Sequence, residues 1–478
     1  MVPVRVPCAD RPGYSQWTLE LASVSSGVST FHFDVPDAYA LLRVLGTGAS
    51  GVVAEAEIVA TRERVAIKRV VGAFSTDTAA LNCLREITLM RAFDHANVVG
   101  LLDAFPPPAR APDDAYFVEP LMESDLHRVI YSGQALSDDH IRVILVQIFR
   151  ALRELHAARV LHRDVKPANI LINSNCTLKL GDFGLARAFT GGGGGGLKES
   201  SADAAGFDAL GIDAANGGGA GSGEREARQG GSGDRNMAVR SSSASGGGEQ
   251  AGSGPEGASA GVSASSADVS AGYNNSDLTE YVITRWYRAP EVMLTSTEYG
   301  PGVDVWGAAC IHAEILGARP LAAGSNYLEQ LDLILKVTGS PDAAAMAFVR
   351  SPRAREFLLS RTRVPPSDFE ALFPTANPLG LDLLKKTLAF NPAQRLTAAE
   401  ALAHPYLAPL WDMKTVASER RDREIEPGGA QDVADEASSM SSSESDVNPA
   451  DLGTKSISEL RDIFTAFTRR FDELHSRR

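Results

Sequence analysis

The strongest chemical signal in the chain is a short loop that gathers a carboxylate, an ammonium group and an amide. Residues 161–171 read Leu-His-Arg-Asp-Val-Lys-Pro-Ala-Asn-Ile-Leu, which places Asp164, Lys166 and Asn169 between apolar flanks. Asp182 follows thirteen positions after the amide, behind a strand-like run. Phosphoryl transfer needs a carboxylate to orient a hydroxyl nucleophile, a cation to meet the phosphoryl group and hard oxygen ligands for Mg²⁺. These residue types at this spacing predict phosphoryl-transfer chemistry.

A glycine-rich segment nearer the N-terminus is suited to cover phosphates. Residues 41–53 contain a G-x-G-x-x-G-x-V pattern, in which glycine lets the backbone approach a phosphate closely. Dinucleotide-binding folds use the same spacing but continue into a helix. Here residues 52–60 alternate like a strand, and Val65-Ala66-Ile67-Lys68 follows a turn. We therefore expect Lys68 to contact phosphates.

Lys68 requires an acidic partner, because an ammonium group is costly to bury without one. Residues 82–93 carry apolar side chains at helical spacing, and Glu86 on this predicted helix is the candidate partner. We also expect a short hairpin formed by residues 17–21 and 28–33. Further predicted elements are a strand over 114–122 and helices over 125–131 and 137–157, the last with a capping start at Ser137.

Together these motifs resemble those of eukaryotic protein kinases. Residues 161–171 are similar to the catalytic loop, Asp182-Phe183-Gly184 to the metal motif, and Ala289-Pro290-Glu291 to the end of the activation segment. Residues 279–288 read Thr-Glu-Tyr-Val-Ile-Thr-Arg-Trp-Tyr-Arg and resemble the dual-phosphorylation lip of mitogen-activated protein (MAP) kinases, best those of the extracellular-signal-regulated type. The similarity covers roughly residues 33–410 apart from an insertion. It implies an α+β, bilobal protein kinase fold with a small β-rich N-lobe, one regulatory helix and a larger helical C-lobe.

The resemblance also implies a role for each motif residue. Asp164 would orient the substrate hydroxyl, and Lys166 would meet the transferring phosphoryl group. Lys68 would hold the α- and β-phosphates of ATP while paired with Glu86. The remaining implied ligands are Asn169 and Asp182 for Mg²⁺, and Leu45, Gly46, Thr47, Gly48, Ala49, Ser50, Gly51, Val53, Ala66, Lys68, Glu119, Pro120, Met122 and Leu171 for ATP.

Two more matches are structural in the family rather than chemical. Asp304 would anchor the catalytic loop from a buried helix, and Arg395 would pair with Glu291. Control would run through phosphorylation of Thr279 and Tyr281, because phosphate adds charge and acceptor oxygens that arginines can hold. The arginines implied are Arg85, Arg163 and Arg187 for Thr279, with Arg285 and Arg288 for Tyr281.

The same resemblance implies partners. Substrates would be proteins with Ser-Pro or Thr-Pro sites. Activation would occur through an upstream dual-specificity MAP kinase kinase or through autophosphorylation.

Three positions depart from the family pattern. Glu119 places a carboxylate at the back wall of the pocket, where burial would favour its neutral form. Ile283 replaces a small residue near the proline-reading pocket, and the acidic docking cluster is reduced to Asp412.

Composition divides the chain into several regions. Residues 191–196 are all glycine, and the Gly/Ala/Ser-rich stretch that follows is too poor in large apolar residues to offset its ordering entropy. We expect this insertion to be disordered. The predicted regions are an N-terminal extension (1–36), an N-lobe (37–122), a C-lobe (123–410) with an insertion over about 189–276, a flexible Ser-rich linker (411–455) and an amphipathic C-terminal helix (456–478).

The C-terminal helix carries both a start signal and an apolar face. Ser456-x-x-Glu459 is a capping box, and a single helix of this length cannot bury its stripe alone. We expect it to dock on the kinase's own surface; a partner, a dimer contact or a membrane surface are the alternatives. The stripe consists of Ile457, Leu460, Phe464, Phe467, Phe471 and Leu474.

Bulk properties exclude several classes of protein. The net charge of −14 argues against generic nucleic-acid binding. Four scattered cysteines favour a reducing compartment without a disulfide framework. We find no signal-peptide core and no apolar run long enough for a membrane span, and we expect a cytoplasmic or nuclear location.

Three other functions share parts of this pattern. A catalytically silent scaffold of kinase fold would be expected to lack Lys68, Asp164 or Asp182, and all three are present. A cyclin-dependent kinase relative would share the chemistry, but the Thr-Glu-Tyr lip and Asn82-Cys-Leu-Arg-Glu disfavour it. An autoactivating, atypical MAP kinase is the third alternative, which the residues do not disfavour.

Overall fold

The computed structural model describes residues 3–8, 11–23, 27–48, 51–106, 111–189, 285–295, 299–411 and 456–475. All described residues belong to one compact unit. Most of the predicted insertion and the whole predicted linker after Trp411 therefore lie outside the described residues.

An antiparallel three-stranded sheet precedes the kinase-like part of the chain. It has the order β1 (Val4–Pro7), β2 (Tyr14–Ser23), β3 (Gly27–Pro36), and β2 pairs with β3 over ten residues. The predicted hairpin is thus confirmed, and it is longer at both ends than the alternation of apolar residues indicated. Its inward side chains, among them Trp17 and Phe33, join one apolar cluster with Tyr116 of the next sheet. The N-terminal sheet is therefore packed onto the N-lobe.

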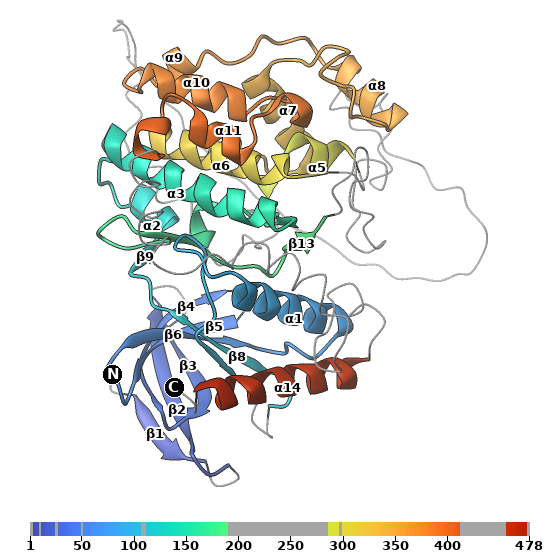
Figure 1. The fold of residues 1–478 in the computed structure, drawn as a ribbon. Helices are drawn as coiled ribbons and strands as arrows, with labels where there is room; N and C mark the ends of the chain where they lie inside the picture. The colour runs from blue at the N-terminus through green and yellow to red at the C-terminus, as the bar shows by residue number, and fades with distance from the viewer. Residues whose placement is uncertain are drawn as a thin grey trace, which may run out of the picture. The chain divides into compact units, whose positions relative to one another are not determined.

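The N-lobe is built on a five-stranded sheet and one long helix (Figure 1). The helix α1 (Asp77–Ala92) begins five residues earlier than predicted, because Thr76 caps it by accepting a hydrogen bond from the Ala79 amide. The sheet has the order β4-β5-β6-β8-β7, with β4 (Tyr39–Gly48), β5 (Gly51–Ile58), β6 (Arg64–Val70), β7 (Asp103–Phe105) and β8 (Ala115–Pro120).

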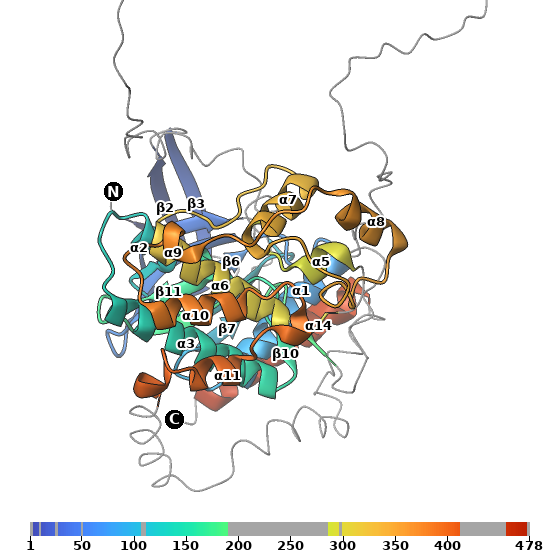
Figure 2. The same cartoon turned by 90° about the horizontal axis from the view of Figure 1, so that it is seen from above.

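The C-lobe is mainly helical, and α3, α6, α10 and α11 pack side by side in both views (Figures 1 and 2). Ser137 caps α3, as predicted. The described helices of the C-lobe are α2 (Leu126–Ile130), α3 (Asp138–Ala157), α5 (Pro290–Leu294), α6 (Gly302–Gly317), α7 (Tyr327–Thr338), α8 (Pro352–Ser360), α9 (Phe369–Leu372), α10 (Pro378–Thr387) and α11 (Ala398–Ala403), with 3-10 turns η1 (Pro167–Asn169) and η4 (Pro392–Gln394). Short strands β9 (Ser124–Asp125), β10 (Val160–Leu161), β11 (Ile170–Ile172), β12 (Leu178–Leu180) and β13 (Arg187–Ala188) frame the loops between them.

The C-terminal helix α14 (Ile457–His475) lies along the N-lobe beside α1 (Figure 1). Its capping box is present, since the Ser456 amide donates to Glu459 Oε2 and the Glu459 amide to Ser456 Oγ. Phe464 is fully buried, with its ring 5.3 Å from Phe74 and 6.2 Å from Phe117. The helix therefore docks on the chain's own surface, which confirms the first of the expected alternatives.

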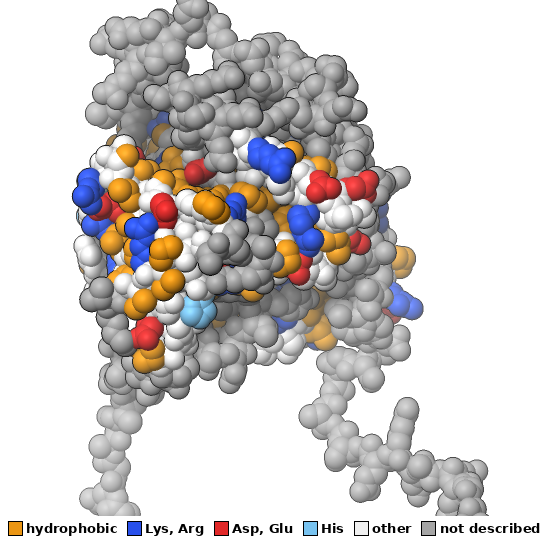
Figure 3. Space-filling model, turned by 90° about the horizontal axis from the view of Figure 1, so that it is seen from below, with side chains coloured by type: hydrophobic (Ala, Val, Ile, Leu, Met, Phe, Trp, Pro, Cys, Tyr) orange, Lys and Arg blue, Asp and Glu red, His pale blue; other side chains and the backbone are white. Residues whose placement is uncertain are grey.

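The face shown in Figure 3 carries hydrophobic, basic and acidic side chains interspersed, without a large field of one sign. Within the described residues, no helix combines the length and apolarity that a membrane crossing would need.

Candidate active site

The predicted carboxylate, ammonium and amide converge in the loop between β10 and β11. Asp164 Oδ2 lies 2.7 Å from Lys166 Nζ and 2.9 Å from Asn169 Nδ2. All three side chains are buried. The same Asn169 amide also donates to the Asp164 carbonyl, which leaves Asn169 Oδ1 as its acceptor. The loop thus holds one carboxylate oriented by two donors.

Asp304 on α6 anchors this loop from below. Its carboxylate accepts hydrogen bonds from the backbone amides of His162 (2.9 Å) and Arg163 (2.7 Å). His156 at the end of α3 is a third partner, with Nε2 2.9 Å from Asp304 Oδ2. Burial alone would raise the pKa of Asp304, but the hydrogen bonds and nearby histidines lower it. Sequence reasoning found Asp304 and missed His156, because a lone histidine at a helix end carries no distinctive spacing.

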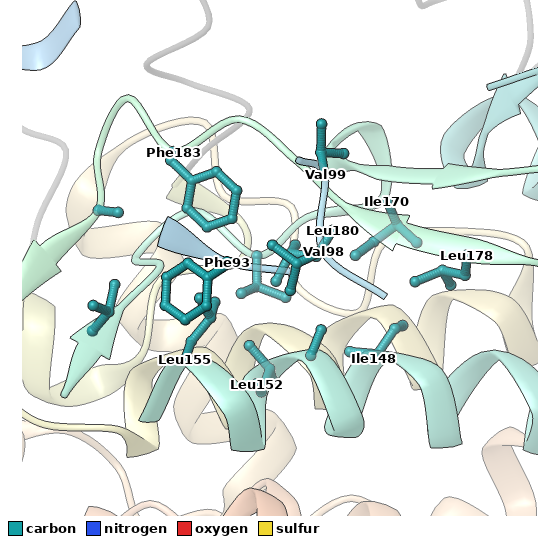
Figure 4. Packing of buried hydrophobic residues seen from close by; sticks show 14 of the residues in the cluster. Phe93, Val98, Val99, Ile148, Leu152, Leu155, Ile170, Leu178, Leu180 and Phe183 are labelled. Carbon is teal, nitrogen blue, oxygen red and sulfur yellow. The ribbon is translucent and has the colours of Figure 1, made fainter. Parts of the chain in front are cut away.

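Asp182 is brought to the same site by the β11–β12 hairpin and by packing of the residue after it. The Gly181 amide donates to the Asn169 carbonyl at 3.0 Å, which joins the two motifs. Phe183 is fully buried, 5.2 Å from the His162 ring and 6.5 Å from the Phe93 ring between centroids. Figure 4 shows Phe93 and Phe183 stacked within the apolar cluster that α3 supports.

The charge of Asp182 is set by competing effects. Burial would raise its pKa, whereas Lys68, Lys166 and His162 lower it, and the net shift is downward. The Asp182 carboxylate and the side-chain amide oxygen of Asn169 are hard oxygen ligands. Two such protein ligands leave coordination positions for phosphate oxygens and water, which suits Mg²⁺.

Lys68 and Glu86 form the ion pair predicted between β6 and α1. Lys68 Nζ lies 2.5 Å from Glu86 Oε1, and both side chains are buried. Burial would lower the pKa of Lys68, but Glu86, Asp182 and Glu119 raise it above its ordinary value. The ammonium therefore stays charged in a buried place, which an interaction with anionic phosphates requires.

The glycine-rich segment is the hairpin that joins β4 to β5, of which Ala49 and Ser50 lie outside the described residues. Gly51 has φ +133°, and a Cβ there would lie 2.0 Å from the Arg69 carbonyl oxygen. A Cβ at Gly46 or Gly48 would meet no atom within 4 Å. Of these three glycines, only Gly51 is thus required by the local packing and backbone conformation.

The β-sheet register brings the expected nucleotide-binding side chains together. Val53 pairs with Lys68, and Ala66 pairs with Glu119, so these side chains share the sheet face that carries Lys68. Leu171 lies on β11, paired with Asp125 of β9. Of the other expected ATP contacts that are described, Leu45 and Thr47 lie on β4, Pro120 ends β8, and Met122 follows that strand.

Glu119 is half-buried and keeps the unusual electrostatics expected of it. Burial raises its pKa to about 7, Glu86 and Asp182 act in the same direction, and Lys68 opposes them. Three carboxylates therefore surround the Lys68 ammonium.

Thr279 and Tyr281 of the predicted lip lie outside the described residues, as does Ile283. Of the five arginines expected to hold their phosphates, Arg187 Nη2 donates to Asn82 on α1 at 3.2 Å. Arg285 Nη1 donates to the Ser325 carbonyl at 3.2 Å. Pairing of β10 with β13 places Arg187 opposite Leu161, two residues before Arg163. Arg85 lies on α1 next to Glu86, and Arg288 lies on the turn before α5.

The segment after the lip is fixed by a buried ion pair. Arg395 Nη1 and Nη2 donate to the two carboxylate oxygens of Glu291 at 2.7 and 3.0 Å. Arg395 also donates to the Gly302 carbonyl and stacks over Trp306. The partnership expected from the family pattern is therefore present in the structure.

Comparison with known proteins identifies the family. The family profile described as "Protein kinase domain" matches residues 39–202 and 266–407. The chain is 38% identical over 382 residues to the mitogen-activated protein kinase spk1 of Schizosaccharomyces pombe, covering 80% of this chain and 81% of that protein. It is 37% identical over 373 residues to mitogen-activated protein kinase 4 of Arabidopsis thaliana, covering 78% and 77%. The chain belongs to the mitogen-activated protein kinase family.

As a MAP kinase, the chain is a protein serine/threonine kinase of bilobal fold, and both predictions are confirmed. Kinases of this family use ATP, generally with Mg²⁺. A further relative, mitogen-activated protein kinase 2 of Pneumocystis carinii, is 38% identical over 381 residues, or 80% of this MAP kinase and 86% of that protein. The profile match is interrupted between residues 202 and 266, within the Gly/Ala/Ser-rich stretch.

Proposed function

We propose that this MAP kinase transfers the γ-phosphoryl group of ATP to Ser-Pro or Thr-Pro sites of proteins and is activated by phosphorylation of Thr279 and Tyr281. The observation that carries the proposed catalytic role is the placement of Asp164, whose Oδ2 is held at once by Lys166 and Asn169. A carboxylate fixed in this way can accept a hydrogen bond from a substrate hydroxyl and orient it for attack.

The other residues divide the remaining work. Lys166 meets the charge that develops on the transferring phosphoryl group, and Lys68, held by Glu86, binds the α- and β-phosphates. Asn169 and Asp182 would hold Mg²⁺, which would supply positive charge to neutralise the phosphates. The backbone between Gly46 and Gly51 would cover the phosphates. Val53, Ala66 and Leu171 would hold the adenine, together with the backbone of Pro120 and Met122.

The catalytic role of Asp164 is tested by substitution. Asp164→Asn removes the anionic acceptor with little change in shape, so kcat should fall by about 10²–10⁴-fold while binding of Mg²⁺-ATP is retained. Asp139→Asn, an exposed aspartate on α3, is the matched control. Undiminished phosphorylation by Asp164→Asn would overturn the assignment.

The switch is tested separately. Thr279→Ala combined with Tyr281→Phe should lower kcat/KM toward a protein substrate, because neither phosphate could then recruit the arginines Arg85, Arg163, Arg187, Arg285 and Arg288. Mass spectrometry of the purified wild type and of Asp164→Asn distinguishes the two routes of activation. Phosphate on the lip of the wild type but not of Asp164→Asn indicates autophosphorylation; its absence from both indicates an upstream kinase.

Proline direction is tested with a pair of substrates. Peptides that differ only in Ser-Pro against Ser-Ala should differ in kcat/KM, with the proline peptide preferred. Equal rates would show that Ile283 has changed the preference that the family pattern implies.

A further inference from the structure

Several basic side chains gather around α3, and the catalytic assignments use none of them. Arg150 and Arg153 project from α3 beside Lys179 of β12 and His95 of the loop after α1. Both arginines stack on Trp411, with guanidinium carbons 5.8 and 4.5 Å from the ring centroid. We call this set of Arg150, Arg153, Lys179, His95 and Trp411 the α3 basic surface.

The charges of the α3 basic surface are poorly balanced. Within the described part of the chain, neither Arg150 nor Arg153 forms an ion pair, and Arg150 Nε is buried without a hydrogen-bond partner. Burial and the three cations lower the pKa of His95 to about 4, with Asp94 opposing. Lys179 donates to the Ala96 and Val98 carbonyls, so its charge is not neutralised there. This surface therefore attracts anions.

An acidic stretch that begins at Glu424 has the complementary charge. Residues 424–451 contain eight acidic residues and no lysine or arginine. Six serines within 438–445 could add phosphate charge. The acidic residues are Glu424, Glu426, Asp432, Asp435, Glu436, Glu444, Asp446 and Asp451.

The chain path places this acidic stretch within reach. The described chain leaves the α3 basic surface at Trp411 itself and resumes at Ser456, before α14. The 44 intervening residues have a contour length of up to roughly 150 Å, far more than a path along one domain requires. The 12-residue linker 412–423 has a root-mean-square end-to-end distance of about 20 Å. This short linker keeps the acidic stretch at high effective concentration near the surface.

We propose that residues 424–451 bind the α3 basic surface of the same chain, contacting Arg150, Arg153 and Lys179. Carboxylates there would form charge-assisted hydrogen bonds with guanidinium groups that are already oriented by stacking on Trp411. The bound segment competes with acidic segments of other proteins for this surface. The proposal is independent of the kinase activity.

The test measures binding of a fluorescently labelled peptide of residues 424–451 to full-length protein by anisotropy. The host is a chain in which the eight acidic residues are replaced by Asn or Gln, so that its own segment cannot compete. This host should bind the peptide, and the wild type should bind it at least about tenfold more weakly. Equal binding by the wild type would show that the surface is open to acidic partners and would overturn the proposal.

Charge reversal on the surface provides the second arm. Arg150→Glu with Arg153→Glu in the neutralised host should weaken peptide binding at least about tenfold. Arg353→Glu with Arg363→Glu, two exposed arginines elsewhere on the C-lobe, should leave it unchanged. If the first pair fails to fold, as judged by circular dichroism, Arg150→Gln with Arg153→Gln replaces it. Unchanged affinity in a folded variant contradicts the proposal.

Salt dependence completes the test. Raising NaCl from about 50 mM to about 500 mM should weaken binding to the host strongly, because charges at the surface are screened. A peptide with the eight acidic residues amidated should not bind at either concentration. Binding of that neutral peptide would exclude the charge complementarity on which the proposal rests.

Discussion

The Lys68 ammonium group interacts with three carboxylates, and the three are not equivalent. Glu86 makes the direct contact, at 2.5 Å, from a helix. Asp182 is held ionised by surrounding cations. Glu119 lies opposite Ala66, diagonal to Lys68 across two strands, and burial raises its pKa to about 7. The raised pKa of Glu119 therefore places its titration near neutral pH.

Stability should report this protonation. The pKa of Glu119 is raised on folding, so the stability linked to its neutral form is present below its ordinary value near 4.5 and is lost as pH rises through about 7. Glu119→Gln should remove this loss, and its melting temperature relative to wild type should increase between pH 5 and pH 8. Glu356→Gln, an exposed carboxylate on α8, is the control. A difference independent of pH would contradict the assignment.

Two glycines of the glycine-rich hairpin differ in the space that is available for an added Cβ atom. Gly51→Ala combines a positive φ with a clash against the Arg69 carbonyl and should destabilise the protein by at least about 2 kcal/mol. Gly48→Ala meets open space and should cost less than about 1 kcal/mol. Urea denaturation of the two variants measures the difference. Similar losses for both would mean that the hairpin has a different backbone in solution.

At the scale of elements, α14 completes a core that the N-lobe does not close alone. Phe464 fills a position between Phe74 and Phe117, and Phe117 lies directly opposite Lys68 in the sheet. Arg91 on α1 stacks over Phe467. The helix that carries Glu86 is thus covered on one side by a helix from the other end of the chain.

Removing the central side chain of this contact should loosen α14. Phe464→Ala should cost about 3–5 kcal/mol of docking free energy, because the ring is fully buried. Faster hydrogen–deuterium exchange in α14 and in α1 measures the effect. Asp462→Ala, on the exposed side of the same helix, should leave exchange unchanged. Protection of α14 that survives Phe464→Ala would contradict the packing seen here.

The sequence predicted the residues of the catalytic motifs but not which surfaces pack together. Asp164, Lys166, Asn169, Lys68 and Glu86 were found because their chemistry depends on spacing within short segments. The stripe of α14 showed that one face must be buried, but periodicity carries no information about which surface covers it. The start of α1 was missed for a related reason: Thr76 acts through a cap geometry that its residue type alone does not distinguish from a loop.

For the molecule as a whole, the Gly/Ala/Ser-rich interruption should matter little to stability. Deleting residues 203–265, which the kinase profile leaves unmatched, shortens the connection between Phe189 and Arg285 about threefold. Loop closure would then become easier by about 1 kcal/mol, so the melting temperature should rise slightly and the fold should persist. Calorimetry of the deletion variant tests this. A large loss of stability would show that the interruption contributes to the core.

The position of α14 in the sequence has a consequence for biosynthesis. Phe117 is translated 347 residues before Phe464, its partner in the packed core. At ordinary rates of synthesis this interval is roughly 20–70 s. During that time the nascent N-lobe presents Phe74 and Phe117 without the helix that covers them. A chain stalled before residue 456 would keep this apolar surface exposed, and it would be a substrate for chaperones rather than a finished kinase.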